Sequence, residues 1–372
     1  MFRAFIFGLL LHAGVLLFAQ DPEILSIGQE APDFSLWGID DKLYSLESFD
    51  TAAVLTIVFT ANHCPTAQAY EDRLNELSLA YEPDEMILLA ISSNHPAAVC
   101  LEELGYSDLG DSFEEIQIRA SDKAFAFPYL YDGVEQAAAR AYGAQATPQV
   151  FIFDRERKLR YSGRIDNMED PYQVATQQDA RNAIDALLAG EAVPVEVTNA
   201  FGCSMKWKSK LDWKKTLDER WKEKPVELSG IDLPGIRELL ENNSSKYRLI
   251  NIWATWCGPC IIEFPEFVDI QRMYGQRNFQ MFTISVDKPS LEEKVKGFLS
   301  EQQAAFPNYI YKGELEQEFM DAIYPNGQVV LPYTLLVAPG GEVVYRHAGI
   351  IDPLELKQAI VNRLGRYYAD DR

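Results

Sequence analysis

Apolar runs and amphipathic stretches alternate along the first half of the chain in a regular order. Residues 54–59 are continuously apolar, which is typical of a strand buried on both faces. A helical pattern follows over 66–79, and residues 86–91 form a second apolar run. The other elements expected here are helices over 112–119, 134–142 and 177–188 and strands over 150–153 and 159–161. This order predicts a strand–helix–strand unit followed by a hairpin and a closing helix.

The second half repeats this order. We expect strands over 249–254, 279–286, 333–337 and 343–345, and helices over 259–273, 291–300 and 353–364. The repeat is about 190 residues long, since Cys64 recurs as Cys257 and Pro148 as Pro332. Two copies of one module, each a mixed sheet with helices on both faces, fit this pattern. The expected fold class is therefore α/β, with two similar domains in tandem.

Length and charge divide the chain near residue 200. A chain of 372 residues predicts two or three domains. Residues 1–205 hold 12 Lys and Arg against 32 Asp and Glu, whereas residues 206–372 hold 22 against 24. We expect a first domain over 24–190, a linker over 191–225 and a second domain over 226–367. The net charge of −22 argues against nucleic acid as a partner.

The expected linker contains a basic, aromatic segment over 206–224, with eight Lys and Arg against four acids. Basic residues interleaved with tryptophan are also a pattern of nucleic-acid binding. In a chain this acidic, we instead expect a helix that docks Trp207 and Trp221 on a domain. Its lysines would face solvent or the acidic first half.

The N-terminus has the pattern of an export signal. Arg3 is followed by an apolar run over 4–19, interrupted only by His12. A membrane-spanning helix needs about 20 residues, so the run is typical of a signal peptide over 1–19, cleaved after Ala19. A retained membrane anchor is the alternative. The mature protein is expected to be soluble, in the periplasm or cell envelope.

The clearest chemical signal is Trp256-Cys257-Gly258-Pro259-Cys260, directly after a predicted strand and before a predicted helix. This spacing brings both sulfurs to the first helical turn, where they can form a disulfide. The helix start favours a thiolate at Cys257, which would attack a substrate disulfide, and Cys260 would resolve the mixed disulfide. Pro259 suits the first helical turn.

Two other interpretations of the cysteine pair are a zinc site and a purely structural disulfide. Zinc needs two further ligands, and His347 is the only histidine in this half of the chain. No metal and no cofactor are therefore expected.

Residues from about 226 to 365 resemble the thioredoxin superfamily, and within it the extracytoplasmic thiol–disulfide reductases of the TlpA/ResA type. Besides the dithiol motif, Glu263-Phe264-Pro265 and Leu331-Pro332-Tyr333-Thr334 carry this resemblance, and an insert near 307–325 suits the same family. The resemblance implies that Glu263 lies near the dithiol and tunes its proton affinity. It also implies that Pro332 is a cis-proline against the dithiol. A solvent-facing Glu263 is the alternative.

The Gly-Pro pair between the cysteines resembles the reducing members of the superfamily. We therefore expect a reductant of protein disulfides. In an oxidising compartment, such a reductant needs an upstream electron donor in the membrane.

The first half carries a single cysteine at the corresponding place, in Thr60-Ala61-Asn62-His63-Cys64-Pro65. Aligning Cys64 with Cys257 puts Ala67 where Cys260 stands, so no resolving thiol lies nearby in sequence. Residues 28–190 resemble the redoxin branch of the superfamily, the alkyl hydroperoxide reductase / thiol-specific antioxidant group. The opening Gly28-Gln29-Glu30-Ala31-Pro32-Asp33-Phe34 and the loop Ala146-Thr147-Pro148-Gln149 carry this resemblance.

The first half also departs from that group. A peroxiredoxin has a hydroxyl three residues before its nucleophile, where this chain has Ala61. His63 can still favour a thiolate at Cys64. Peroxidase activity, thiol exchange and a structural relic all remain open for Cys64. The candidate resolving cysteines are Cys203, in a segment that could reach back, and Cys100.

The favoured function is an extracytoplasmic protein thiol–disulfide oxidoreductase that reacts at Cys257 and Cys260. One alternative is a thiol-dependent peroxidase, with antioxidant activity, whose Cys64 is re-reduced by the second domain. In another, the first domain only binds a client protein and the second domain alone reacts.

Overall fold

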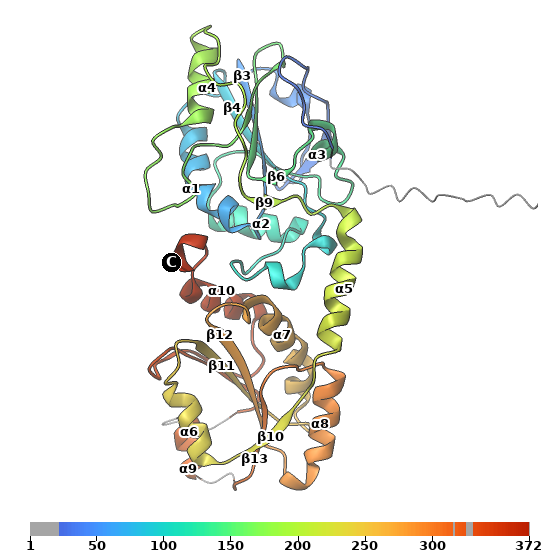
Figure 1. Ribbon diagram of the computed structural model, residues 1–372, viewed down its shortest axis with the longest axis vertical. Coiled ribbons are helices and arrows are strands. Elements are labelled where there is room, and N and C mark those ends of the chain that lie inside the picture. The colour runs from blue at the N-terminus through green and yellow to red at the C-terminus, as the bar shows by residue number, and fades with distance from the viewer. Residues whose placement is uncertain (1–21, 315–316, 325–329, 372) are drawn as a thin grey trace, which may run out of the picture.

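The computed structural model describes residues 22–314, 317–324 and 330–371. It has two α/β domains, drawn one above the other in Figure 1, with α5 (Leu211–Lys222) running along one side between them. The predicted signal peptide and the alternative of a retained anchor fall on residues outside this description. Within the described residues, no helix is both long and apolar enough to cross a membrane.

The first domain is built on a mixed sheet with strand order β2-β1-β5-β4-β3-β7-β8. The strands are β1 (Ser35–Gly38), β2 (Leu43–Ser45), β3 (Val54–Thr60), β4 (Met86–Ser92), β5 (Tyr129–Tyr131), β7 (Gln149–Phe153) and β8 (Leu159–Gly163). The helices are α1 (Pro65–Leu79), α2 (Phe113–Asp122), α3 (Ala137–Tyr142) and α4 (Asp179–Leu188). All seven residues of β3 are buried, because this central strand contributes to a hydrophobic cluster on each face of the sheet.

The second domain has strand order β10-β13-β12-β11-β14-β15. Its strands are β10 (Leu228–Ile231), β11 (Tyr247–Trp253), β12 (Phe279–Ser285), β13 (Asn308–Tyr311), β14 (Tyr333–Val337) and β15 (Val343–Ala348). Its helices are α6 (Leu233–Glu241), α7 (Gly258–Tyr274), α8 (Glu292–Glu301), α9 (Gln317–Ile323) and α10 (Pro353–Leu364). The insert expected near 307–325 holds β13 and α9, and its residues 315, 316 and 325 lie outside the description.

The two sheets share one arrangement. In each, the strand before the cysteine motif pairs in parallel with the next strand of the chain and antiparallel with the first strand of the closing hairpin. The predicted α/β class, with two mixed sheets flanked by helices, is confirmed. One helix is shorter than expected over 134–142. It begins at Ala137, because the Asp132 carboxylate accepts the N–H groups of Ala138 and Ala139 and so fixes the helix start.

The segment expected to be a linker packs against both domains. Trp207 is buried in the core of the first domain, and Trp221, at the end of α5, is buried in the core of the second. Before Trp207, the short strand β9 (Cys203–Ser204) pairs with β6 (Ala146–Thr147) of the first domain. Residues 203–207 are therefore part of the first domain in space.

The domains meet through the C-terminal end of α7. The Tyr274 hydroxyl donates to the Ser107 carbonyl oxygen at 2.8 Å, in buried surroundings. The Arg272 guanidinium forms an ion pair with Glu102, and Arg277 donates to the Gly105 carbonyl oxygen. The chain after α10, including the short 3-10 helix Tyr368–Asp371, returns to the first domain, near α2 and α1 in Figure 1.

Candidate redox sites

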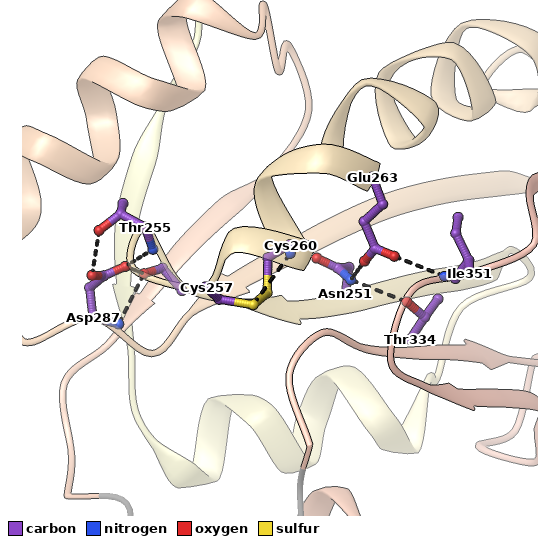
Figure 2. Close-up of a disulfide and its surroundings, with 9 residues drawn as sticks. Asn251, Thr255, Cys257, Cys260, Glu263, Asp287, Thr334 and Ile351 are labelled. Carbon is purple, nitrogen blue, oxygen red and sulfur yellow. Dashed lines mark hydrogen bonds between the residues drawn. A yellow bond between two sulfur atoms is a disulfide. The ribbon is translucent and has the colours of Figure 1, made fainter.

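The dithiol of the second domain lies where β11 ends and α7 begins. Cys257 is the N-cap residue of α7, and it forms a disulfide with Cys260, with 2.06 Å between the sulfurs (Figure 2). The Cys260 backbone N–H donates to the Cys257 sulfur at 3.3 Å. The exposed fraction is 6% for Cys257 and 1% for Cys260. Solvent and partners therefore reach the first sulfur more readily than the second.

A buried carboxylate fixes the loop in front of the dithiol. Asp287 accepts the Thr255 backbone N–H at 2.8 Å and the Thr255 hydroxyl at 2.7 Å, and it also accepts the Ser285 hydroxyl (Figure 2). Asp287 follows β12 closely, so two neighbouring strands together position the cysteine loop. Sequence analysis did not find Thr255 or Asp287. A buried polar residue just after an apolar strand is the signal that marks the aspartate.

Glu263 lies one turn after Cys260 on α7 and is 3% exposed, so it does not face solvent. Its carboxylate accepts the Ile351 N–H at 2.9 Å and the Asn251 amide at 3.2 Å (Figure 2). Burial raises the pKa of Glu263 to about 7, although these two hydrogen bonds favour the charged form. The group can therefore take up or release a proton near neutral pH.

Asn251 joins three elements beside the dithiol. Its side-chain amide donates to Glu263 on α7 and to the Thr334 hydroxyl on β14, at 3.2 and 3.1 Å. Asn251 was missed from the sequence, although an asparagine inside the apolar run of β11 is itself a signal. Thr334 belongs to the predicted cis-proline loop, and the Leu331–Pro332 peptide is cis.

Exposed apolar side chains adjoin, in sequence, residues of the core cluster that holds the dithiol. Leu331 and Ile351 pack in the same cluster as both cysteines. The residues preceding Cys257, Leu331 and Ile351 in sequence are large, apolar and exposed: Trp256 at 64%, Val330 at 53% and Ile350 at 49%. These three side chains are therefore available to contact an apolar partner.

The first domain places Cys64 at the corresponding point, as the N-cap residue of α1, with no exposed surface. The Ala67 N–H donates to its sulfur at 3.4 Å, and its thiol can donate to the Thr147 carbonyl oxygen at 3.1 Å. The Thr147–Pro148 peptide is cis, as in the second domain. Ala67 occupies the place of a resolving cysteine.

A buried ion pair lies beside Cys64. The His63 Nδ1 atom is 2.6 Å from the Asp111 carboxylate, which also accepts the Asn62 N–H and the Asn94 amide. Burial lowers the pKa of His63, but the charge and hydrogen bond of Asp111 outweigh burial and raise it. The chain before α2 gives no sequence signal for Asp111, which comes close to His63 only in the fold.

The structure brings one of the two candidate resolving cysteines to Cys64. Cys203, on β9, packs against Cys64 and hydrogen-bonds its sulfur. Burial raises the pKa of Cys64, but the Cys203 hydrogen bond and the positive charge of His63 bring it down to about 6. Cys100 is buried elsewhere, where its thiol contacts the Ala98 carbonyl oxygen, and burial raises its pKa to about 11.

Among the residues that the structure describes, no group of three or more His, Cys, Asp or Glu side chains is arranged to hold a metal ion.

Comparison with family models matches each half of the chain separately. Residues 27–162 match the AhpC/TSA family, and residues 228–360 match the Redoxin family. Together with the shared sheet arrangement, these matches show that the chain carries two thioredoxin-superfamily domains in tandem.

Curated relatives include a thiol-disulfide oxidoreductase ResA of Bacillus thuringiensis subsp. konkukian, 27% identical over 118 residues. That match covers 32% of this chain and 64% of the relative. The thioredoxin-like protein YneN of Bacillus subtilis is 25% identical, over 34% of this chain and 71% of the relative. The chain therefore spans less than two thirds of the length of this ResA relative.

Solved structures also resemble part of the chain. An uncharacterised conserved protein of Geobacillus kaustophilus is 35% identical, over 49% of this chain and 93% of that one, with a TM-score of 0.43. A thiol:disulfide interchange protein DsbE of Chlorobium tepidum, named as putative in its title, is 26% identical over 34% of this chain and 85% of that one, with a TM-score of 0.29.

Proposed function

We propose that this protein is an extracytoplasmic thiol–disulfide oxidoreductase that reduces disulfides of other proteins through Cys257 and Cys260. The observation that carries the proposal is the disulfide at the start of α7, with the more accessible sulfur at the N-cap. The name of the ResA relatives, thiol-disulfide oxidoreductase, supports the same activity.

In the proposed reaction, the reduced protein attacks with the Cys257 thiolate, which the helix start and the Cys260 N–H stabilise. One sulfur of the substrate disulfide bonds to Cys257, and the other leaves as a thiol. Cys260 then attacks Cys257, which releases the second substrate thiol and leaves the pair oxidised. Two electrons from an upstream donor restore the dithiol.

Glu263 is proposed to act as the base for the resolving thiol, Cys260. Its pKa of about 7 and its place one turn after Cys260 suit a group that accepts this proton as Cys260 attacks. Asn251 would act as a positioning residue, because it ties Glu263 to β14.

Two parts of this proposal, the extracytoplasmic location of the protein and the direction of electron flow, rest on the sequence. The apolar run over 4–19 favours export, and Gly-Pro between the cysteines favours a reductant. The donor would then be a membrane protein that carries electrons into an oxidising compartment.

The test is a protein-disulfide reduction assay with the full chain. The wild type should reduce insulin disulfides, Cys257→Ser should be inactive, and Cys260→Ser should accumulate a mixed disulfide with the substrate. Cys100→Ser, in which a buried thiol outside the site is changed, is the matched control. Normal turnover by Cys260→Ser without a trapped adduct would reject the two-step reaction.

A second candidate function, a thiol peroxidase at Cys64, is favoured by one observation, the lowered pKa of that thiol. In this domain arrangement, the dithiol of the second domain is not placed to reduce an oxidised Cys64 by direct contact. At about 1.5 Å per residue, the 17 residues of α7 place the dithiol about 25 Å from the helix end that contacts the first domain. A peroxide-consumption assay on wild type and Cys64→Ser decides this question.

A further inference from the structure

The first domain carries its own strand at the place that the second domain leaves open. Thr147, the residue before Pro148, pairs with Cys203 across the β6–β9 ladder. In the second domain, the corresponding residue is Leu331, and no strand pairs with it in the described part of the chain. The strand at Thr147 comes from the segment that leads to the second domain.

Several contacts hold this strand in place. The Met205 N–H donates to the Gln145 carbonyl oxygen at 3.0 Å, and the Lys206 N–H donates to the Asn94 side chain at 2.7 Å. Gly202, directly before β9, has φ of +143°, and a Cβ there would lie 2.0 Å from the Thr147 carbonyl oxygen. Only glycine lets the chain approach Thr147 so closely. The close approach puts the Cys203 sulfur against Cys64.

A cavity between the domains reaches Cys203, one member of this pair. It has a volume of about 620 Å³, which is within the range of small-molecule sites. Its lining includes His63, Cys203, Lys206, Arg277 and Tyr368. Cys64 lies behind Cys203 and has no exposed surface. The His63 Nε2 atom is buried without a hydrogen-bond partner, although His63 is 1% exposed and lines the cavity.

We propose that Cys64 and Cys203 form a second redox pair, which closes into an intrachain disulfide by exchange with a small-molecule disulfide that enters this cavity. Cys203 attacks one sulfur of the incoming disulfide, and its proton goes to the first group that leaves, which departs as a thiol. The Cys64 thiolate then attacks the Cys203 sulfur, and the second group leaves as a thiolate that takes a proton from solvent. The two cysteine sulfurs are oxidised to one disulfide, and the incoming disulfide is reduced to two thiols, one with the proton of Cys203 and one with a proton from water.

The charges around the pair fit this order. The His63–Asp111 pair favours the thiolate at Cys64, which acts as the resolving nucleophile, whereas the neighbouring Cys64 and burial raise the pKa of Cys203. The oxidised pair would bond the start of the interdomain segment covalently to the first domain.

The experiment uses the full chain with Cys257→Ser and Cys260→Ser, so that its result is independent of the proposed reductase site. The protein is brought to equilibrium with glutathione disulfide, free thiols are alkylated, and peptides are mapped by mass spectrometry without reduction. We expect one cross-linked peptide pair that joins Cys64 to Cys203, and an alkylated Cys100 as the internal control. Free Cys64 and Cys203 at equilibrium, or a glutathione adduct on Cys203 that never resolves, would overturn the proposal.

A second comparison tests the placement of the strand while both cysteines stay in the chain. Gly202→Ala should slow cross-linking by about tenfold or more, because a shift of the strand separates the sulfurs. Gly190→Ala is the matched control, since Gly190 also has positive φ, +73°, but a Cβ there meets nothing within 4 Å. Equal rates in the two variants would show that the β6–β9 pairing does not position Cys203.

Discussion

The two domains place a cysteine at the same point of the same fold, but they differ in what can reach it. Cys64 and Cys257 each cap the helix that follows the central strand. Cys257 keeps a small exposed fraction of 6% and follows the exposed Trp256, whereas Cys64 has no exposed surface and packs against Cys203 on β9. A helix start favours a thiolate in both domains. The two sites therefore differ mainly in how accessible the cysteine is to a partner, and segments far away in sequence set this accessibility.

The reactive sulfurs of the two domains also lie at different places relative to the domain interface. The first domain turns its cysteine side toward the interface, where His63 and Cys203 line the interdomain cavity. The second domain uses the C-terminal end of α7 for the interface, so its dithiol lies at the far end of that helix. Direct exchange between the two sites requires the domains to separate or a second molecule to take part.

The ionisable neighbours differ as well. The first domain sets a histidine, whose pKa Asp111 raises, beside its sulfur, and the second sets a carboxylic acid near its dithiol. A cation stabilises a thiolate, whereas a nearby carboxylate disfavours a second negative charge. The same fold therefore gives opposite electrostatic surroundings to the two sites.

The largest expected effect separates the two cysteines by function. Cys257→Ser should abolish protein-disulfide reduction, because Cys257 supplies the attacking sulfur and Cys260 is the less accessible of the two. Cys64→Ser should keep most of this activity, since Cys64 faces the opposite way. Initial rates of insulin reduction measure both. Loss of activity in Cys64→Ser, in a protein that still folds, would mean that electrons pass through the first domain.

The second expected effect is a pH-dependent change in stability on Glu263→Gln. The folded-state pKa of Glu263 is raised to about 7, so its proton stabilises the folded protein at low pH. That contribution is lost as pH rises from about 4.5 through 7. Relative to wild type, Glu263→Gln should therefore gain about 3 kcal/mol in unfolding free energy between pH 4.5 and pH 8, at about 1.4 kcal/mol per pKa unit.

Urea unfolding of the oxidised protein at the two pH values gives this number. Glu266→Gln, on the same helix, is the matched control, because Glu266 is half-exposed and pairs with Lys357. Its effect should stay below about 1 kcal/mol at both pH values. If the two variants behave alike, the Glu263 carboxylate is solvated in solution. In the reduced protein, removal of the Glu263 charge should also lower a dithiol pKa, which thiolate absorbance follows.

A third, smaller effect tests the opposite surroundings of Cys64. Asp111→Asn removes the charge that raises the pKa of His63 and so favours its cationic form, and the pKa of Cys64 should therefore rise from about 6 by about one unit or more. Thiolate absorbance in the Cys257→Ser, Cys260→Ser background measures it. An unchanged titration curve would show that the Cys203 hydrogen bond alone stabilises the thiolate.

The two domains and their cysteine motifs can be predicted from the sequence, whereas the surroundings of Cys64 depend on contacts between residues far apart in the chain. The apolar runs of β3 and β11 and the cysteine motifs after them predict both domains, because local pattern and neighbouring residues carry that information. The β6–β9 pairing joins residues more than 50 positions apart and involves strands of two residues each, too short for any periodic signal. The approach of Asp111 to His63, 48 residues apart, is likewise visible only in the fold.

The interdomain contacts were outside the reach of the sequence for a related reason. In the sequence, Arg277 and Arg366 look like ordinary surface residues that follow the ends of α7 and α10. In the fold, Arg277 lies 4.0 Å from the centre of the Tyr106 ring, and Arg366 forms an ion pair with the buried Asp108. The segment expected to be a linker is itself divided, with Trp207 in one core and Trp221 in the other. A boundary drawn from composition could not assign residues 203–207 to the first domain.

The smallest expected effect concerns the cover over Cys203. The Tyr368 hydroxyl lies 4.0 Å from the Cys203 sulfur, and the Tyr368 ring packs edge-on against Tyr106. Tyr368→Ala opens the cavity beside Cys203 without touching Cys64, so alkylation of Cys203 in the reduced protein should become several-fold faster. Tyr172→Ala is the control, because Tyr172 also binds the C-terminal segment, through Asp370, but does not contact the sulfur. Time-resolved labelling with mass mapping measures both rates. Equal acceleration by the two variants would show that the whole C-terminal segment loosens, and then the sealed state of the first site depends on domain docking rather than on one tyrosine.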